Sequence, residues 1–257
     1  MRLGSRAALP LPLWLAVTAA LLCLFVLIRG LIGDPATAAQ QAAPQATLGI
    51  EVYDRTADTA LLSSNADKTF PAESVVKLLI AIDAVNRHKS TTSRITQMLA
   101  RSDDSIADAL WSADGGPKIV TTLAAQLQLR HTTPPPDPAR WGDTTTTADD
   151  VVRIYRYLES SNQQTIINAL YHAPAIAADG FDQSFGIPSM GKADWWVKQG
   201  WGCCRPDRVL HTTGLVGTNQ RYVLVILSSA PSSTNATEAA DAITAATRAL
   251  TPLLRAR

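Results

Sequence analysis

Apolar and polar positions divide the chain into an apolar leader, a polar linker and a folded domain. Apolar residues run almost without interruption from Ala7 to Ile28, which is about the length that spans a bilayer. Because Arg2 and Arg6 precede this run, the positive-inside rule puts the N-terminus in the cytoplasm and the rest of the chain outside. The sequence therefore predicts a membrane anchor or signal segment over residues 1–32.

Two other interpretations of this leader stay open. Residues 36–38, Ala-Thr-Ala, fit the small-residue pattern of a signal-peptide cleavage site, in which case the domain would be secreted. A lipoprotein with Cys23 as the lipid carrier is less favoured, because Leu22 is bulky where a small residue is expected. Residues 33–46 are rich in Ala, Gln and Pro without an apolar period, which predicts a linker before a domain at 47–257.

The domain opens with strand patterns and continues as a helix. Apolar positions alternate over residues 48–52, and a second strand is expected at 60–64, so the two predict a hairpin. From Ala72 to Val85 apolar residues recur at the helical period, and Pro71 stands at a position suited to a helix start. A largely buried helix therefore follows the hairpin.

The remaining pattern predicts a helical block, three strands and a last helix. Helical stretches are expected at 105–111, 119–127, 148–158 and 164–171, strands at 195–200, 209–213 and 222–228, and a final helix after Asn235, with Glu238 completing a capping box. The simplest closure places the hairpin beside the three late strands. The expected fold is α/β of the α+β type: an antiparallel five-stranded sheet with packed terminal helices plus an all-helical subdomain.

Composition narrows the classes of function. The net charge is +1 and the domain has no basic block, which excludes nucleic acid as an expected partner. The four histidines are dispersed without metal-ligand spacing, so neither a metal nor another cofactor is expected. Cys203 and Cys204 are adjacent, and two separate thiols are the favoured interpretation, although export permits oxidation and their redox state stays open.

Ser74-Val75-Val76-Lys77, at the start of the first helix, is the first candidate for chemistry. Residues three apart share a helix face, so the Lys77 amine can approach the Ser74 hydroxyl. Serine becomes a nucleophile when a base takes its proton, and lysine is a base only when neutral. A helix N-terminus also offers free N–H groups and a positive dipole end for an oxyanion.

Two further motifs follow in chain order. Ser102-Asp103-Asp104 precedes a predicted helix, and Lys198-Gln199-Gly200 lies on a predicted strand. With the S-x-x-K motif they resemble the S-x-x-K, S-D-N and K-T-G set of class A β-lactamases and penicillin-binding proteins. Residues 143–147, D-T-T-T-T, resemble the segment after the omega loop of class A enzymes. The chain from 47 to 257 thus resembles a divergent member of this penicillin-recognising family.

The resemblance implies a catalytic role for each matched residue. Ser74 would attack a β-lactam or a peptidoglycan-derived acyl-D-Ala-D-Ala peptide, and Lys77 would help to activate it. Ser102 would shuttle protons near the leaving nitrogen, and Lys198 would help to hold the substrate carboxylate. The backbone N–H groups of Ser74 and Trp201 would form the oxyanion hole.

Asp104, Gln199, Gly200 and Trp201 would line the substrate site, and two of them depart from the family pattern. Asp104 replaces an asparagine, so it accepts but does not donate, and its charge near Lys77 favours the ammonium form. Gln199 replaces a hydroxyl residue and would offer its amide N–H groups to a substrate carboxylate. The tryptophans at 195, 196 and 201 either line an aromatic wall or pack in the core.

The loop before residue 143 lacks the glutamate that, in class A enzymes, positions the hydrolytic water. From His131 to Gly142 the only carboxylate is Asp137, which predicts slow deacylation. Three functions stay open: a serine hydrolase or acyltransferase that forms an acyl-enzyme on β-lactams or peptidoglycan peptides, a catalytically degenerate protein that binds cell-wall material or a protein partner, and a hydrolase of another kind. The last rests on residues 186–191, G-I-P-S-M-G, which faintly resemble a nucleophile elbow.

Overall fold

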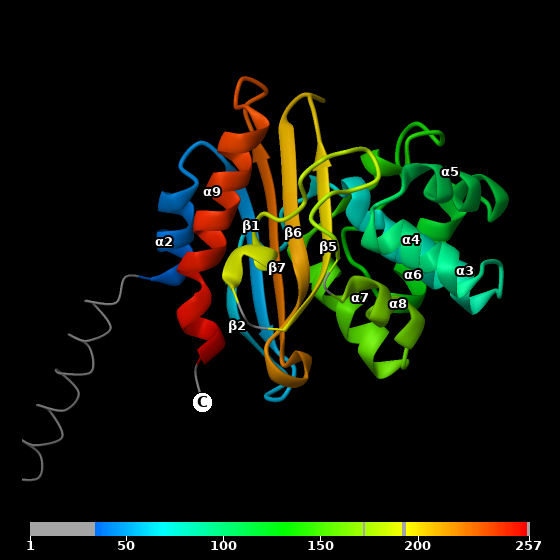
Figure 1. Cartoon of the computed structure of the whole chain (residues 1–257), viewed down its shortest axis with the longest axis horizontal. Helices are drawn as coiled ribbons and strands as arrows, with labels where there is room; N and C mark the ends of the chain where they lie inside the picture. The colour runs from blue at the N-terminus through cyan, green and yellow to red at the C-terminus, as the bar shows by residue number, and fades with distance from the viewer. Residues whose placement is uncertain (1–33, 172, 192–193, 256–257) are drawn as a thin grey trace, which may run out of the picture.

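The computed structural model describes residues 34–171, 173–191 and 194–255, which form three layers (Figure 1). A five-stranded sheet stands in the middle, two helices cover one face, and a block of helices lies on the other side (Figure 1). No helix within these ranges is long and apolar enough to cross a membrane. The predicted anchor or signal segment, 1–32, lies outside the described residues.

The elements follow the predicted order of hairpin, helical block, three strands and helix. The strands are β1 (Thr47–Asp54), β2 (Thr59–Ser64), β3 (Phe70–Pro71), β4 (Thr145–Thr146), β5 (Trp195–Gly202), β6 (Arg208–Val216) and β7 (Tyr222–Ala230). The α-helices are α2 (Pro35–Ala42), α3 (Lys77–Asn86), α4 (Thr92–Ala100), α5 (Asp104–Ala113), α6 (Pro117–Leu127), α7 (Ala148–Ser160), α8 (Gln164–Leu170) and α9 (Ala236–Ala249). Three of the short 3₁₀ turns are η1 (Glu73–Val76), η2 (Trp141–Asp143) and η3 (Ile187–Met190).

The large sheet has the strand order β2-β1-β7-β6-β5, with antiparallel pairing throughout. The N-terminal hairpin therefore pairs with the last strand, and the predicted fold is confirmed. Strand β7 is central and buried on both faces: Val223, Val225 and Leu227 face the helical block, while Leu224 and Ile226 face α2 and α9. Its continuous apolar run follows from this double burial.

The predicted linker over 33–46 is wrong for its central part, because residues 35–42 form helix α2. Asp34 caps this helix by accepting the Thr37 N–H at 3.2 Å, and Pro35 fills the first helical position. Ala39 and Ala43 are buried with α9 in the core on that face of the sheet (Figure 1). Small alanines provide little apolar periodicity, yet they let the two helices pack closely.

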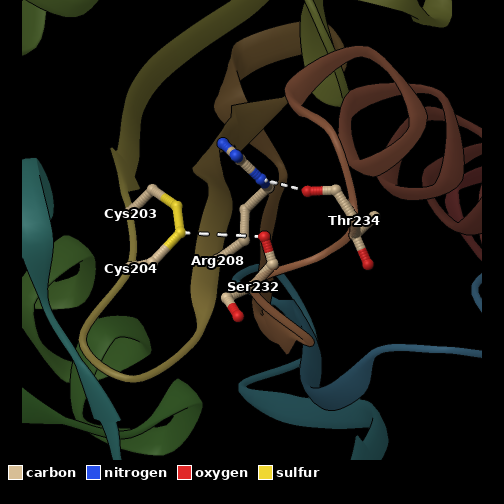
Figure 2. The surroundings of a disulfide bond; sticks show 5 residues. All are labelled: Cys203, Cys204, Arg208, Ser232 and Thr234. Atoms are coloured by element: carbon tan, nitrogen blue, oxygen red, sulfur yellow. Dashed lines mark hydrogen bonds between the residues drawn. A yellow bond between two sulfur atoms is a disulfide. The ribbon is translucent and has the colours of Figure 1, made fainter.

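The two adjacent cysteines after β5 are joined by a disulfide, so the favoured interpretation of two separate thiols is wrong (Figure 2). The loop that leaves β5 is no longer a regular strand, in which neighbouring side chains would point to opposite faces. Here both sulfur atoms lie on one side, and Cys204 Sγ contacts Ser232 O at 3.8 Å (Figure 2). The disulfide lies directly beyond Gly202, the last residue of β5.

Candidate active site

The chain reaches the nucleophile segment through the small sheet of β3 and β4. These strands pair antiparallel, and the Ala72 N–H donates to Thr144 O at 2.6 Å. Turn η1 then carries Ser74, and α3 begins at Lys77. Pro71 therefore belongs to β3 rather than to the helix start, and the D-T-T-T-T segment fixes the approach to Ser74.

His211, on β6, holds the same approach from the large sheet. Its Nε2 lies 2.7 Å from Pro71 O, and its Nδ1 accepts the Ser228 N–H at 3.0 Å. Because a carbonyl can only accept and an N–H can only donate, the ring is the neutral Nε2–H tautomer. Burial lowers the pKa of His211 to about 4, so this arrangement persists at neutral pH.

The four catalytic side chains predicted from the three motifs meet in one cluster. Lys77 Nζ lies 2.8 Å from Ser74 Oγ and 3.1 Å from Ser102 Oγ. Lys198 Nζ donates to the same Ser102 Oγ at 2.9 Å. All four side chains are buried, and even Ser74 is only 5% exposed. A continuous chain of polar atoms therefore links the serine of η1 to the lysine of β5.

Asp104 forms an ion pair with Lys77, at 2.5 Å between Oδ1 and Nζ, while its own side chain is 61% exposed. Burial of the Lys77 amine is the largest influence and lowers its pKa, whereas the Asp104 charge raises it. The net shift is downward. The contact expected from the sequence is therefore present, but burial outweighs the stabilisation of the ammonium form.

Lys198 is completely buried, and its Nζ also donates to Gln199 O at 2.9 Å. Burial lowers the pKa of Lys198 well below its ordinary value, and the nearby Lys77 charge lowers it further. Ser102 lies between the two amines with a φ of 53°, in the left-handed region that non-glycine residues rarely occupy. Asp103 holds it there by capping α5 through the Ile106 N–H at 3.2 Å.

Strand β5 lies against the nucleophile turn because Gly200 has no side chain. A Cβ at Gly200 would lie 3.1 Å from Val75 Cγ2 and 3.2 Å from Ala72 O. Glycine thus permits the close approach that brings Lys198 to the serines.

Gln199 lies differently from the prediction. Its Nε2 donates to Phe185 O at 2.7 Å and Gln183 O at 3.2 Å, and the side chain is only 1% exposed. Both amide N–H groups are therefore used by backbone carbonyls. In this structure Gln199 joins β5 to the 183–185 segment and does not offer a donor to the cleft.

The three tryptophans of β5 separate into core and site. Trp195 is buried in the core beneath α9, and Trp196 packs against the core of the helical block. Trp201 borders the site, with its ring centroid 5.8 Å from Lys198 Nζ and stacked on Phe181 at 4.8 Å. Of the three tryptophans that the sequence offered as an aromatic wall, only Trp201 therefore borders the site.

Two bordering residues were not singled out from the sequence, because long-range folding brings them to the cluster. The Trp141 ring lies 4.7 Å from Lys77 Nζ, and its Nε1 donates to Asp108 Oδ1 at 2.7 Å. Asp179 accepts the Trp201 Nε1–H at 3.0 Å, and its charge raises the pKa of both Lys77 and Lys198. Neither loop position carries a periodic signal that could have revealed it.

Glu73, directly before the nucleophile, is the third residue that sequence reasoning missed. Its carboxyl lies against Gly202 at the end of β5 and 3.2 Å from where a Cβ of Gly142 would stand. Burial raises the pKa of Glu73 to about 7, and the Asp143 charge adds to this shift. The φ of Glu73 is 47°, which turns its side chain in a direction that no sequence pattern indicates.

The structure also describes the residues of the other kinds of site that the sequence raised. Across the described ranges, no group of three or more His, Cys, Asp or Glu side chains is arranged to hold a metal. Residues 186–191 contain turn η3, where Ser189 Oγ donates to Gly186 O at 2.6 Å. The nucleophile-elbow interpretation is wrong, because this serine lies on a 3₁₀ turn and not between a strand and a helix.

Comparison with known proteins supports the same family. A model described as "Beta-lactamase enzyme family" matches residues 89–254, a range that begins after Ser74 and Lys77. The protein named "Putative lipoprotein LppW" of Mycobacterium tuberculosis, and that of the same name in Mycobacterium bovis, are 37% identical over 230 residues, covering 83% of this chain and 72% of LppW.

Solved structures show the same fold. A class A β-lactamase from Mycobacterium abscessus is similar with a TM-score of 0.71 and 18% identity, covering 88% of this chain and 100% of that one. A β-lactamase from Chitinophaga pinensis also gives 0.71, at 13% identity and 86% and 99% coverage. PBP-A, solved as a variant in acyl-enzyme complex with penicillin G, gives 0.67 at 16% identity and 86% and 96% coverage. The chain belongs to the β-lactamase enzyme family.

Proposed function

We propose that this protein is a serine hydrolase or acyltransferase that forms an acyl-enzyme on Ser74 with β-lactams or peptidoglycan peptides and releases it slowly. The observation that carries the proposal is the buried Ser74–Lys77–Ser102–Lys198 cluster, with each nitrogen 2.8–3.1 Å from a serine hydroxyl. An isolated S-x-x-K pair on a helix surface would not be buried or shared with a second serine and lysine.

The contacts of Lys77 suit a neutral amine that acts as a base. Asp104 Oδ1 and the backbone oxygen of Ser102, at 2.5 and 2.8 Å, can only accept hydrogen bonds. A neutral amine would give its two N–H groups to these acceptors and keep its lone pair for the Ser74 hydroxyl at 2.8 Å. The lowered pKa of Lys77 supports the same state.

The proposed acylation moves one proton through the cluster. Ser74 Oγ attacks the substrate carbonyl carbon while Lys77 Nζ takes the hydroxyl proton. The resulting oxyanion accepts from the backbone N–H groups of Ser74 and Trp201. When the C–N bond breaks, Ser102 passes a proton to the leaving nitrogen and regains one from Lys77, which leaves an ester on Ser74 and a neutral base.

The substrate class is proposed from the cluster and from the fold neighbours. Lys198 and Trp201 lie on one side of the cluster, and the Lys198 amine would donate a hydrogen bond to the carboxylate that β-lactams and D-Ala-D-Ala peptides share. PBP-A, which has the same fold, is the neighbour solved as a penicillin G acyl-enzyme. Gln199 is left out of the proposed binding residues, and Asp104 is assigned to Lys77.

The direct test is to incubate the full-length protein in detergent with a fluorescent penicillin and measure intact mass over time. We expect a covalent adduct in the wild-type protein and none in Ser74→Ala. Ser189→Ala, which removes the serine of η3, serves as the matched control and should be labelled like the wild type. An adduct that persists in Ser74→Ala, or its absence from the wild type, would refute the proposal.

A second candidate function is binding of cell-wall peptides without catalysis. The ion pair between Asp104 and Lys77 favours it, because an ammonium cannot take the Ser74 proton. Saturable binding of a D-Ala-D-Ala peptide by a protein that forms no adduct with any β-lactam would establish this alternative.

We also propose that residues 1–32 attach the domain to the outer side of the membrane. The apolar run over 7–28 and the lipoprotein name of LppW support attachment. Proteolysis of intact spheroplasts should remove the domain, while washing at high pH should not release it. Release of a shortened chain into the medium would instead favour the cleaved signal peptide.

A further inference from the structure

The loop that would carry the hydrolytic glutamate has none, yet a carboxyl borders the same side of the nucleophile. Glu73 precedes Ser74, and its carboxyl lies between Gly142, in η2, and Gly202, at the end of β5. A side chain at Gly202 would collide with this carboxyl, so the glycine leaves the space that the carboxyl fills. The carboxyl that the loop lacks is thus present on a different element.

Glu73 differs from the neighbouring described carboxylates in having no hydrogen-bond or ion-pair partner among the described residues. Each of the others is engaged: Asp104 with Lys77, Asp143 with Arg140, Asp108 with Trp141, and Asp179 with Trp201. Within the described residues, Glu73 makes neither a hydrogen bond nor an ion pair, although most of it is buried. An unpartnered, partly buried carboxylate is costly for stability, which favours a role in function.

The backbone of Glu73 is also in an unfavourable conformation, which costs free energy of folding. Its φ of 47° lies in the left-handed region, where a non-glycine residue is strained, and such strain concentrates at functional sites. Glu73 and Ser74 are neighbours in the chain, with Cα atoms about 3.8 Å apart, and hydrolysis by Glu73 requires one water to bridge its carboxyl and an ester on Ser74. The proposed nucleophile, Ser74, and the carboxyl group of Glu73 therefore lie on the same short turn, η1.

We propose that the Glu73 carboxylate is the general base that activates water to hydrolyse the acyl-Ser74 ester. Glu73 takes one proton from water as the water oxygen attacks the ester carbonyl carbon. The bond from that carbon to Ser74 Oγ then breaks, and the proton returns from Glu73 to Ser74 Oγ. The products are a free carboxylic acid and the original serine. This step rests on the acyl-enzyme proposed above and deepens it.

The charged groups around Glu73 suit this role at neutral pH. Burial and the charges of Asp143 and Asp104 raise its pKa, while Arg140 and Lys77 lower it, with a result of about 7. A general base works best when its pKa lies near the working pH. The deacylation rate should therefore rise with pH through this region.

The test follows the mass of penicillin-labelled full-length protein in detergent after excess penicillin is removed. In Glu73→Gln we expect acylation within about threefold of wild type and deacylation slower by about 10² to 10⁴-fold, the usual worth of a general base. Glu73→Asp, with a shorter reach, should deacylate at an intermediate rate. The rise of wild-type deacylation with pH near 7 should be absent from Glu73→Gln.

Glu51→Gln is the matched control, because Glu51 is also a buried glutamate whose pKa is raised to about 7 but it lies on β1 among charges of α7. Its deacylation rate should equal that of the wild type. Equal deacylation of Glu73→Gln and wild type would overturn the inference, as would a wild-type adduct that never decays, and both results would leave the acyl-enzyme proposal intact. No wild-type adduct would overturn both.

Discussion

The two sides of the candidate site are held in different ways. The acylation side, Ser74, Lys77, Ser102 and Lys198, is joined by hydrogen bonds of 2.8–3.1 Å. The loop side consists of Glu73, Trp141 and Gly142, where Glu73 makes no hydrogen bond within the described residues.

This difference separates the two half-reactions. The residues of the acylation side lie on η1, α3, β5 and the capped start of α5, so regular structure fixes them. The loop side depends on one strained residue and on the short turn η2. We infer that formation of the ester follows the family pattern, while its hydrolysis depends on features particular to this chain.

Removing Lys77, the proposed base of the acylation side, should have the largest effect on the rate of acylation. In Lys77→Met an apolar side chain of similar length replaces the buried amine, so the protein should fold, while acylation falls by about 10³-fold. Stopped-flow labelling with fluorescent penicillin measures the rate. Lys89→Met, at an exposed position, is the control. An acylation rate within about tenfold of wild type would assign the base to another group.

His211 tests whether the scaffold behind the acylation side depends on pH. The folded-state pKa of about 4 lies below the ordinary 6.5, so the unfolded chain binds more protons between these values. Stability from His211 is present above pH 6.5 and is lost as pH falls toward 4, by about 3 kcal/mol. Glu51 and Glu73, with raised pKa values, act with the opposite sign nearby.

The contribution of His211 to the free energy of unfolding is therefore measured as the difference between the wild type and a His211 variant. Urea unfolding of wild type and His211→Phe at pH 7 and pH 4 should show their difference in unfolding free energy shrinking by about 3 kcal/mol at the lower pH. A difference that stays constant would show that this ring does not change protonation on unfolding.

Asp104→Asn tests mainly the acylation side, where Asp104 forms an ion pair with Lys77. Loss of the carboxylate removes the influence that raises the pKa of Lys77. More neutral amine should then be present at acidic pH, so acylation at pH 6 should be faster by about fivefold, in keeping with ~1 kcal/mol for an ion pair whose carboxylate is largely exposed. Because the Asp104 charge also raises the pKa of Glu73, the rise of deacylation with pH should move to a slightly lower pH, while the deacylation rate well above pH 7 should be unchanged. A slower acylation would mean that Asp104 positions Lys77 more than it charges it.

The disulfide beyond β5 should have the smallest effect on either side. A cross-link between neighbouring residues closes almost no loop, so the double variant Cys203→Ser and Cys204→Ser should lose about 1 kcal/mol or less of unfolding free energy. Acylation and deacylation rates should stay within about twofold of wild type. A larger change in deacylation alone would couple this disulfide to the loop side through Gly202.

The sequence predicted the parts of the molecule whose residues have strong local signals. Strand β7 was predicted at 222–228 from its apolar run, and α9 from the capping box of Asn235 and Glu238. The clustering of Ser74, Lys77, Ser102 and Lys198 was predicted from the resemblance of three ordered motifs to those of the family.

The misses share a physical cause, which is dependence on long-range contacts. Helix α2 is rich in alanine and acquires its buried face only from α9. Helix α4 buries only Ile95, Met98 and Leu99, too few positions for a clear period. A positive φ at Glu73 turns its carboxyl toward Gly142 and Gly202, and two backbone carbonyls of the 183–185 segment hold the Gln199 amide.

Because residues 35–42 fold onto α9, little flexible chain is left between the proposed membrane segment, 1–32, and the folded domain. Fully extended, residues 33–46 would have spanned about 45–50 Å. Helix α2 converts most of that length into a fixed part of the domain. If residues 1–32 are anchored in the membrane, the Ser74 site is held close to the bilayer surface. It would then contact the cell-wall material nearest the membrane, and not material farther out.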